Sequence, residues 1–208
     1  MSNGFPSLWS PLKKLVFLKA TALNAALPDG YQRVAGFTFG ASTYYKITGF
    51  KLKGSDTIRM SFSVTKACNV FGCYTTTTAT DNYSLYMSSS SGAKYLRYGG
   101  DTYNSYIASS AFNNRFDVVI SPTGTRGMPT DSVITPAEFT ASADLCIGTT
   151  STGATSSKLD GKIWGSIVVD GRLKLIPCER TSDHVLGYYD AVSGTFYEPT
   201  GSAPTVIS

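Results

Sequence analysis

The amino-acid sequence predicts an all-β domain, and two observations support this fold class. First, apolar and polar residues alternate with a period of two in several short segments after Tyr31, which is the pattern of strands that turn one face toward a core. Second, the chain holds 13 tyrosines and 11 phenylalanines but only three glutamates, Glu138, Glu179 and Glu198, and this composition favours strands. Because no helical pattern follows residue 30, we expect a two-layer sandwich or barrel.

Residues 1–30 show a different pattern, so we predict an N-terminal segment, 1–30, followed by one domain, 31–208. Ser10-Pro11 is a helix start signal, and Pro28-Asp29-Gly30 is a stop. Between them, apolar residues recur at roughly helical spacing: Leu12, Leu15, Val16, Ala22, Leu23, Ala26 and Leu27. The apolar stripe of such a helix needs a cover. Two alternatives stay open: the helix packs on the domain's own flank, or it docks on other proteins or forms an oligomer, for which a trimer is favoured.

The strands of the domain are predicted from alternation and turn signals. Asp170-Gly171 marks a hairpin, since the turn that matches strand twist needs positive φ. Ser/Thr/Gly tracts at 75–80, 88–92 and 149–157 are expected loops. The expected strands are a region from Tyr44 that continues past Phe50, then Ile58–Val64, Tyr83–Met87, Phe116–Ile120 (ended by Ser121-Pro122-Thr123-Gly124), Ile163–Val169 with Trp164 on the opposite face, and Leu173–Leu175, ended by Pro177.

The charge pattern argues against nucleic acid as a partner, and the lack of a long apolar run argues against membrane insertion. Eighteen basic and 14 acidic side chains give a net charge of +4, without a basic motif. The apolar run after Lys13-Lys14 is interrupted by Lys19, so it is too short for the apolar core of a signal peptide. No stretch approaches the ~18 apolar residues of a transmembrane helix.

The four cysteines are expected to be buried thiols, which suits folding in a reducing cytoplasm. Cys68, Cys73, Cys146 and Cys178 lack the spacing of a structural zinc site. Cys68 and Cys73 can bridge if they flank a tight turn, and spacing alone does not decide this. No cofactor or metal is predicted; a calcium site would need several oxygen ligands in one place, and no acidic cluster marks one.

Short motifs in the last third of the chain resemble a known family. They are Gly161-Lys162-Ile163-Trp164, Asp170-Gly171-Arg172-Leu173, Leu175-Ile176-Pro177-Cys178-Glu179, Gly187-Tyr188-Tyr189-Asp190, Val192, Gly194-Thr195-Phe196-Tyr197 and Gly201. They resemble the end of the concanavalin A-like lectin/glucanase (laminin-G-like) modules of phage and prophage proteins of gut bacteria, with Tyr188 where leucine is usual. Gly30-Tyr31, Ser42–Tyr45 and Gly49-Phe50 resemble the family's start, so the likeness covers about residues 30–200.

The resemblance implies a two-sheet antiparallel jelly-roll sandwich, with the motif residues as scaffold and no catalytic residue. Glucanase relatives of this fold place their carboxylates as E-x-D-x-x-E, and the sequence has no such motif. It also has no nucleophile elbow, Walker loop or dinucleotide fingerprint. Its single histidine, His184, precedes the closing hairpin and is expected at the surface. We therefore expect no enzymatic activity.

Glycan binding is the most specific chemistry that the sequence offers. Asp101, Tyr103, Asn104 and Tyr106 combine aromatic rings with a carboxylate and an amide in an expected Gly-flanked loop, and sugars suit such surfaces. Asp81-Asn82-Tyr83 is a second candidate.

The leading hypothesis is a non-enzymatic bacteriophage virion protein: a head fibre, a capsid decoration or a tail-associated lectin-like knob. It would fold in the host cytoplasm, attach to other virion proteins through residues 1–30, and contact host surface glycans. The alternatives are a carbohydrate-binding module at the bacterial cell surface and, third, a glycoside hydrolase of the same fold.

Overall fold

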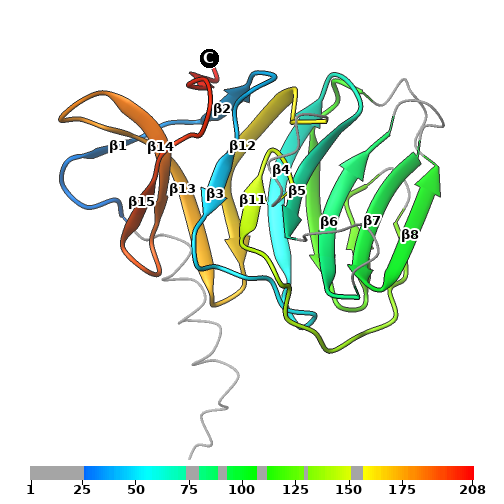
Figure 1. The fold of residues 1–208 in the computed structure, drawn as a ribbon. Coiled ribbons are helices and arrows are strands. Elements are labelled where there is room, and N and C mark those ends of the chain that lie inside the picture. The colour runs from blue at the N-terminus through cyan, green and yellow to red at the C-terminus, as the bar shows by residue number, and fades with distance from the viewer. Residues whose placement is uncertain (1–25, 74–79, 89–92, 107–111, 129–130, 151–156) are drawn as a thin grey trace, which may run out of the picture.

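The computed structural model describes residues 26–73, 80–88, 93–106, 112–128, 131–150 and 157–208. Within these ranges the chain forms strands and no helix, and the strands make two antiparallel sheets that pack face to face (Figure 1). The predicted all-β class and the two-sheet antiparallel sandwich are confirmed. The predicted N-terminal helix falls almost wholly in residues 1–25, which lie outside the described residues.

The larger sheet has ten strands and the smaller has six. The ten strands are β1 (Tyr31–Arg33), β2 (Gly36–Phe39), β4 (Ile58–Val64), β9 (Phe116–Ser121), β10 (Gly124–Arg126), β12 (Gly161–Val169), β13 (Leu173–Arg180), β14 (Val185–Asp190), β15 (Thr195–Tyr197) and β16 (Thr205–Val206). The six strands are β3 (Tyr45–Ile47), β5 (Cys68–Cys73), β6 (Asn82–Met87), β7 (Ala93–Gly99), β8 (Asp101–Tyr106) and β11 (Leu145–Ile147). The main order is β10-β9-β4-β12-β13-β14-β15 in the larger sheet and β3-β11-β5-β6-β7-β8 in the smaller one.

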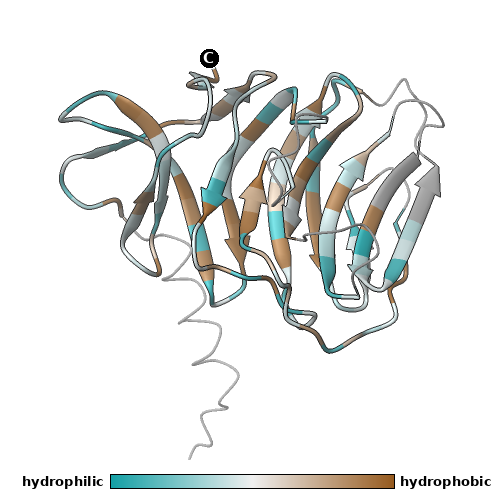
Figure 2. Cartoon of the chain, viewed as in Figure 1, coloured by the Kyte–Doolittle hydropathy of each residue, from teal (hydrophilic) through white to brown (hydrophobic). Residues whose placement is uncertain are grey.

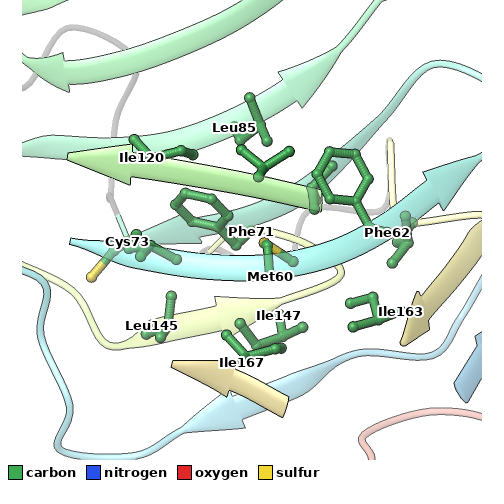
Figure 3. Packing of buried hydrophobic residues seen from close by; sticks show 14 of the residues in the cluster. Met60, Phe62, Phe71, Cys73, Leu85, Ile120, Leu145, Ile147, Ile163 and Ile167 are labelled. Atoms are coloured by element: carbon green, nitrogen blue, oxygen red, sulfur yellow. The ribbon is translucent and has the colours of Figure 1, made fainter. Parts of the chain in front are cut away.

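The core lies between the two sheets and is built by the alternation that the sequence shows. Figure 2 shows hydrophobic and hydrophilic residues alternating along many of the strands. In β4, Met60 and Phe62 point inward, and they meet Phe71 and Leu85 of the smaller sheet (Figure 3). The predicted core residues of β9 and β12, such as Ile120 and Ile163, belong to the same cluster. Burial of these side chains, at roughly 1.5–3 kcal/mol each, is the main force that holds the sheets together.

The predicted hairpin at Asp170-Gly171 is confirmed. Val169 pairs with Leu173, so three residues connect β12 to β13, and the N–H of Arg172 donates to the carbonyl of Val169 at 2.9 Å. Gly171 has φ of +73°, the conformation that glycine adopts without a steric penalty.

A bulge in β12 marks the place where this strand changes one of its neighbours in the larger sheet. Trp164 pairs with Ser61, and Val168 pairs with Arg59. Between these two pairs β12 has three residues and β4 has one, so β12 contains two extra residues. The two extra residues preserve the alternation, which is why both Ile163 and Ile167 face the core. Before the bulge β12 also pairs with β2, and after it with β13.

Pro177 does not end a strand, contrary to the sequence prediction, because β13 continues to Arg180. Up to Leu175 this strand pairs with β12, and from Cys178 it pairs with β1. The carbonyl of Pro177 accepts from the N–H of Val34, on the side of β13 where β12 and β1 pair. Its ring nitrogen faces the same side, in the gap between the end of β12 and the start of β1. A residue without an N–H therefore loses no ladder hydrogen bond here.

The predicted strand from Tyr44 past Phe50 is also too long. β3 ends at Ile47, and a turn follows in which Gly49 has φ of +79° and Phe50 donates to the carbonyl of Ile47. The sequence prediction included Phe50 in the strand because it is apolar, but the chain turns at Gly49, before Phe50 is reached.

Candidate functional site

The four predicted glycan-binding residues lie in an edge strand, not in a loop. Asp101, Tyr103, Asn104 and Tyr106 all belong to β8, which pairs only with β7 among the described strands. Tyr98 pairs with Asp101, so the flanking glycines form a two-residue hairpin and not the ends of a loop. The sequence prediction was wrong here because Gly-rich flanks are shared by loops and tight hairpins.

The two described side chains of this set are bonded to the protein itself. Tyr103 is half-buried against the core; its hydroxyl donates to Oδ2 of Asp101 at 3.3 Å and accepts from the N–H of Thr135 at 3.1 Å. The hydroxyl of Tyr103 therefore ties β8 to the segment at Thr135. The side chains of Asn104 and Tyr106 lie outside the described residues.

The second predicted candidate, Asp81-Asn82-Tyr83, is contradicted by burial. Tyr83 has no exposed surface, stacks edge-on against Tyr98 at 5.3 Å, and donates its hydroxyl to the carbonyl of Asp56 at 3.3 Å. Asn82 is buried as well. Tyr83 is a core residue, as its place in an alternating strand also predicted.

The outer face of the smaller sheet carries a polar and aromatic pattern that the sequence interpretation did not single out. The core-facing Leu85 and Leu96 alternate with Ser84, Tyr86 and Arg97, which lie on the other face. Strand pairing puts these outer positions into two rows across the sheet: Gly72–Ser84–Arg97–Thr102 and Asn69–Tyr86–Tyr95–Asn104.

These two rows, which we call the front face, are the candidate carbohydrate surface of the domain. Of its described side chains, Thr102 is exposed, Tyr86 and Arg97 are half-buried, and Ser84 and Asn69 are buried, so a hydroxyl, a tyrosine ring and a guanidinium are the groups that could meet the hydroxyls and apolar faces of sugars. Part of the front face is already covered, because Asn69 donates its side-chain amide to the carbonyl of Ser157 at 3.2 Å and a Cβ on Gly72 would lie 2.9 Å from Cα of Thr150. The polar members of alternating strands were the signal that sequence reasoning passed over. Position 104 of the predicted set falls in one of these rows.

Most carboxylates of the domain are paired with cations and not with each other. The buried Asp56 accepts from Arg172, Asp170 from Arg59 at 3.2 Å, and both Asp183 and Glu198 from Arg180. His184 is exposed, as predicted, and its Nδ1 lies 2.5 Å from Oε1 of Glu179. The remaining ion pairs are Lys46–Asp144, Lys66–Asp160 and Arg115–Asp117. This pattern is typical of carboxylates that stabilise a surface, and it does not resemble the paired acids of a glycosidase.

The cysteines are free and buried. Cys68 and Cys73 lie at the two ends of β5, about 16 Å apart on a straight strand, so they do not flank a tight turn and cannot bridge. Burial raises the pKa of Cys68, Cys146 and Cys178 to about 11 and that of Cys73 to about 12, from an ordinary value of 9.0.

These thiols make the fold less stable as the pH becomes alkaline. Above pH 9 the unfolded chain loses thiol protons that the folded chain keeps, so the unfolded state binds fewer protons and the free energy of unfolding falls as pH rises. We expect the free energy of unfolding not to depend on pH through the thiols below about pH 8, and to fall by about 2 kcal/mol or more between pH 8.5 and 10, measured by urea unfolding. The raised pKa of buried Tyr83 acts in the same direction. A curve that is flat or rises over this range would contradict the expectation, and Cys73→Ala should make the fall less steep, because it removes one of the four thiols.

Among the described residues, no group of three or more histidine, cysteine or acidic side chains is arranged to hold a metal ion. No helix in the described ranges has the length and apolar character needed to cross a membrane.

No protein-family model matches this chain, and no curated protein matches it either. Function must therefore be inferred from the residues and their geometry.

Proposed function

We propose that the chain is a non-enzymatic structural or adhesion protein of a bacteriophage particle, carried as a head fibre, capsid decoration or tail-associated knob. Residues 31–208 form a concanavalin A-like jelly roll in this proposal, and residues 1–30 attach it to other virion proteins, as a trimer. The protein folds in the host cytoplasm and contacts host surface glycans once it is on the particle.

The observation that carries the proposal is the structural role of the residues that resemble the phage-encoded modules. Tyr188 is fully buried in the core, and its ring meets Tyr45 edge-on at 4.8 Å. Gly187 allows Phe196 to cross directly above it, and Asp190 holds the turn between β14 and β15. Since these residues close the larger sheet, they support a shared architecture, and the phage context is proposed from the resemblance of the motifs alone.

The absence of catalysis in this proposal is supported by the pairing of the carboxylates. Hydrolysis of a glycosidic bond by this fold needs two carboxyl groups about 5–9.5 Å apart that are free to exchange protons with the substrate. Of the described acids, Asp183 and Glu198 share one partner, Arg180, whose guanidinium bonds to both at 2.6 and 2.7 Å. Their shared guanidinium lowers the pKa of the Asp183 carboxyl, which disfavours Asp183 as a general acid.

The proposal is tested on the full-length chain and on particles. Light scattering after gel filtration should give a mass three times that of the chain, and antibodies against the chain should label intact particles. The double substitution Leu15→Asp and Leu23→Asp should produce a folded monomer and remove the label. Val192→Asp is the matched control, because it places the same charge at a side chain of the domain that is already 56% exposed. A monomeric wild-type chain together with unlabelled particles would refute the proposal.

A second candidate is a bacterial carbohydrate-binding module at the cell surface, and the front face favours it. On a glycan array this candidate predicts tight binding by a monomer, and Tyr86→Ala should reduce that binding about tenfold. Binding that is unchanged by Tyr86→Ala would exclude the front face as the site.

A further inference from the structure

A hollow of about 530 Å³ lies on the outer face of the larger sheet, on the opposite side of the sandwich from the front face. Its size is within the range of small-molecule sites. It is bounded by β4, β9 and β10 and by residues 131–133, and its lining includes Arg59, Val119, Ser121, Arg126, Asp131 and Val133. We call it the edge hollow.

The wall of the edge hollow is fixed by backbone hydrogen bonds. The N–H of Thr125 donates to the carbonyl of Ser132 at 2.8 Å, and the N–H of Ser132 donates back to Oγ1 of Thr125 at 2.8 Å. The segment crosses so close to β10 that a Cβ on Gly124 would lie 2.6 Å from the carbonyl oxygen of Ser132. The hollow is therefore preformed by the fold.

Two arginines flank the floor of the hollow in one row. Strand pairing places Arg59 opposite Val119 and Val119 opposite Arg126, so the three side chains share a face. The guanidinium of Arg59 is engaged by Asp170 through Nε and Nη2, both at 3.2 Å. The positive charge of Arg59 is therefore already balanced by Asp170.

Arg126, by contrast, forms no ion pair in the described part of the chain. All 14 acidic residues of the chain lie within the described residues, and none of them forms an ion pair with Arg126. The exposed guanidinium is a planar fork of donors whose geometry matches a carboxylate. Asp131 lies on the neighbouring segment, one step beyond the hydrogen bonds that join Thr125 and Ser132, and in the described chain it forms no ion pair either, so its oxygens remain able to accept from hydroxyl groups.

The hollow also has a small apolar surface. Val133 is 87% exposed, more than the other large apolar side chains found at the surface of the described chain, and it stands at the rim; Val119 is half-buried on the floor. Two valines are too small a patch for a protein interface, but they suit the apolar face of one sugar ring.

We propose that the edge hollow binds a saccharide that bears a carboxylate. The carboxylate pairs with Arg126, and the ring rests against Val119 and Val133. The sugar hydroxyls donate to Asp131 and to the hydroxyl oxygen of Ser121, whose own proton is donated to the carbonyl of Gly124 at 3.0 Å. This inference rests on the proposed adhesion function for the biological source of the sugar, and on the geometry of the hollow for its chemistry.

Titration calorimetry with the full-length chain tests the proposal. The probes are oligosaccharides of galacturonate, of glucuronate and of N-acetylneuraminate, each compared with its methyl ester, which keeps the sugar and removes the charge. We expect at least one acid to bind, its ester to bind about tenfold more weakly or worse, and added salt to weaken the acid alone.

Variants locate the site. Arg126→Ala should weaken binding of the acid about tenfold or more and leave the ester unaffected, while Arg126→Lys should recover part of the loss. Arg115→Ala is the matched control, because Arg115 is an exposed arginine on the same face that stacks on Trp164 at 5.3 Å, outside the hollow. Equal affinity for acid and ester, equal effects of the two alanine variants, or no binding by any of the acids would each overturn the proposal. Because none of these measurements depends on particles or oligomers, the edge hollow and the virion proposal fail separately.

Discussion

Replacement of Asp190 by alanine is expected to lower the free energy of unfolding by about 3 kcal/mol, measured by urea or thermal unfolding. Asp190 is only 2% exposed, and its carboxylate accepts four hydrogen bonds. The donors are the N–H groups of Lys174 (2.9 Å), Val192 (3.1 Å) and Ser193 (3.1 Å) and the hydroxyl of Ser193 (2.6 Å). Alanine leaves the buried N–H of Lys174 without an acceptor, and it releases the turn that joins β14 to β15.

Two variants control for this interpretation. Asp190→Asn retains one acceptor oxygen and should lose about half as much stability. Glu138→Ala removes an exposed carboxylate and should change the free energy of unfolding by no more than about 0.5 kcal/mol. A loss below about 1 kcal/mol for Asp190→Ala would show that the turn forms without the carboxylate.

Gly187→Ala is expected to cost a similar amount, about 3 kcal/mol, for a purely steric reason. A Cβ at position 187 would lie 2.4 Å from Cζ of Phe196 and 2.5 Å from the carbonyl oxygen of Tyr197. The ring of Phe196 can turn aside, but the carbonyl belongs to β15, which is paired with β14 through Tyr188 and Tyr197. The edge of the larger sheet must therefore separate to admit one methyl group.

Gly40→Ala is the matched control, since a Cβ there would meet its nearest atoms at 3.8 Å. We expect its effect to stay within about 0.5 kcal/mol. Adding Phe196→Ala to Gly187→Ala should recover part of the loss if the ring contributes to the clash, and none of it if the carbonyl alone does. Equal stability of Gly187→Ala and Gly40→Ala would contradict the geometry of this hairpin.

The local chemistry of the chain predicted much of the fold. Alternation at Ile58–Val64 and Phe116–Ile120 identified two strands and the side chains that they bury. Apolar residues at every second position all reach the core only when the segment is a strand with that face buried. Asp170-Gly171 identified a hairpin, because few dipeptides accept its backbone angles.

The errors came from positions where a neighbour distant in sequence decides the outcome. Pro177 lies inside a strand only because β12 and β1 leave a gap beside it. Residues 101–106 form a strand because β7 is available to pair with them. In both cases the local signal, a proline or a pair of glycines, was interpreted without the partner that overrides it.

The candidate sites show the same division. The sequence by itself determined which residues are apolar, which alternate and where the chain turns, and these properties fix the class of fold because burial of alternate residues leaves few arrangements. Only the tertiary structure decided that Tyr103 is committed to Asp101 and Thr135, and that Arg59, Arg126 and Asp131 surround one hollow. The physical reason is that strand pairing joins residues that are far apart along the chain, and its register depends on all the strands packing together at once.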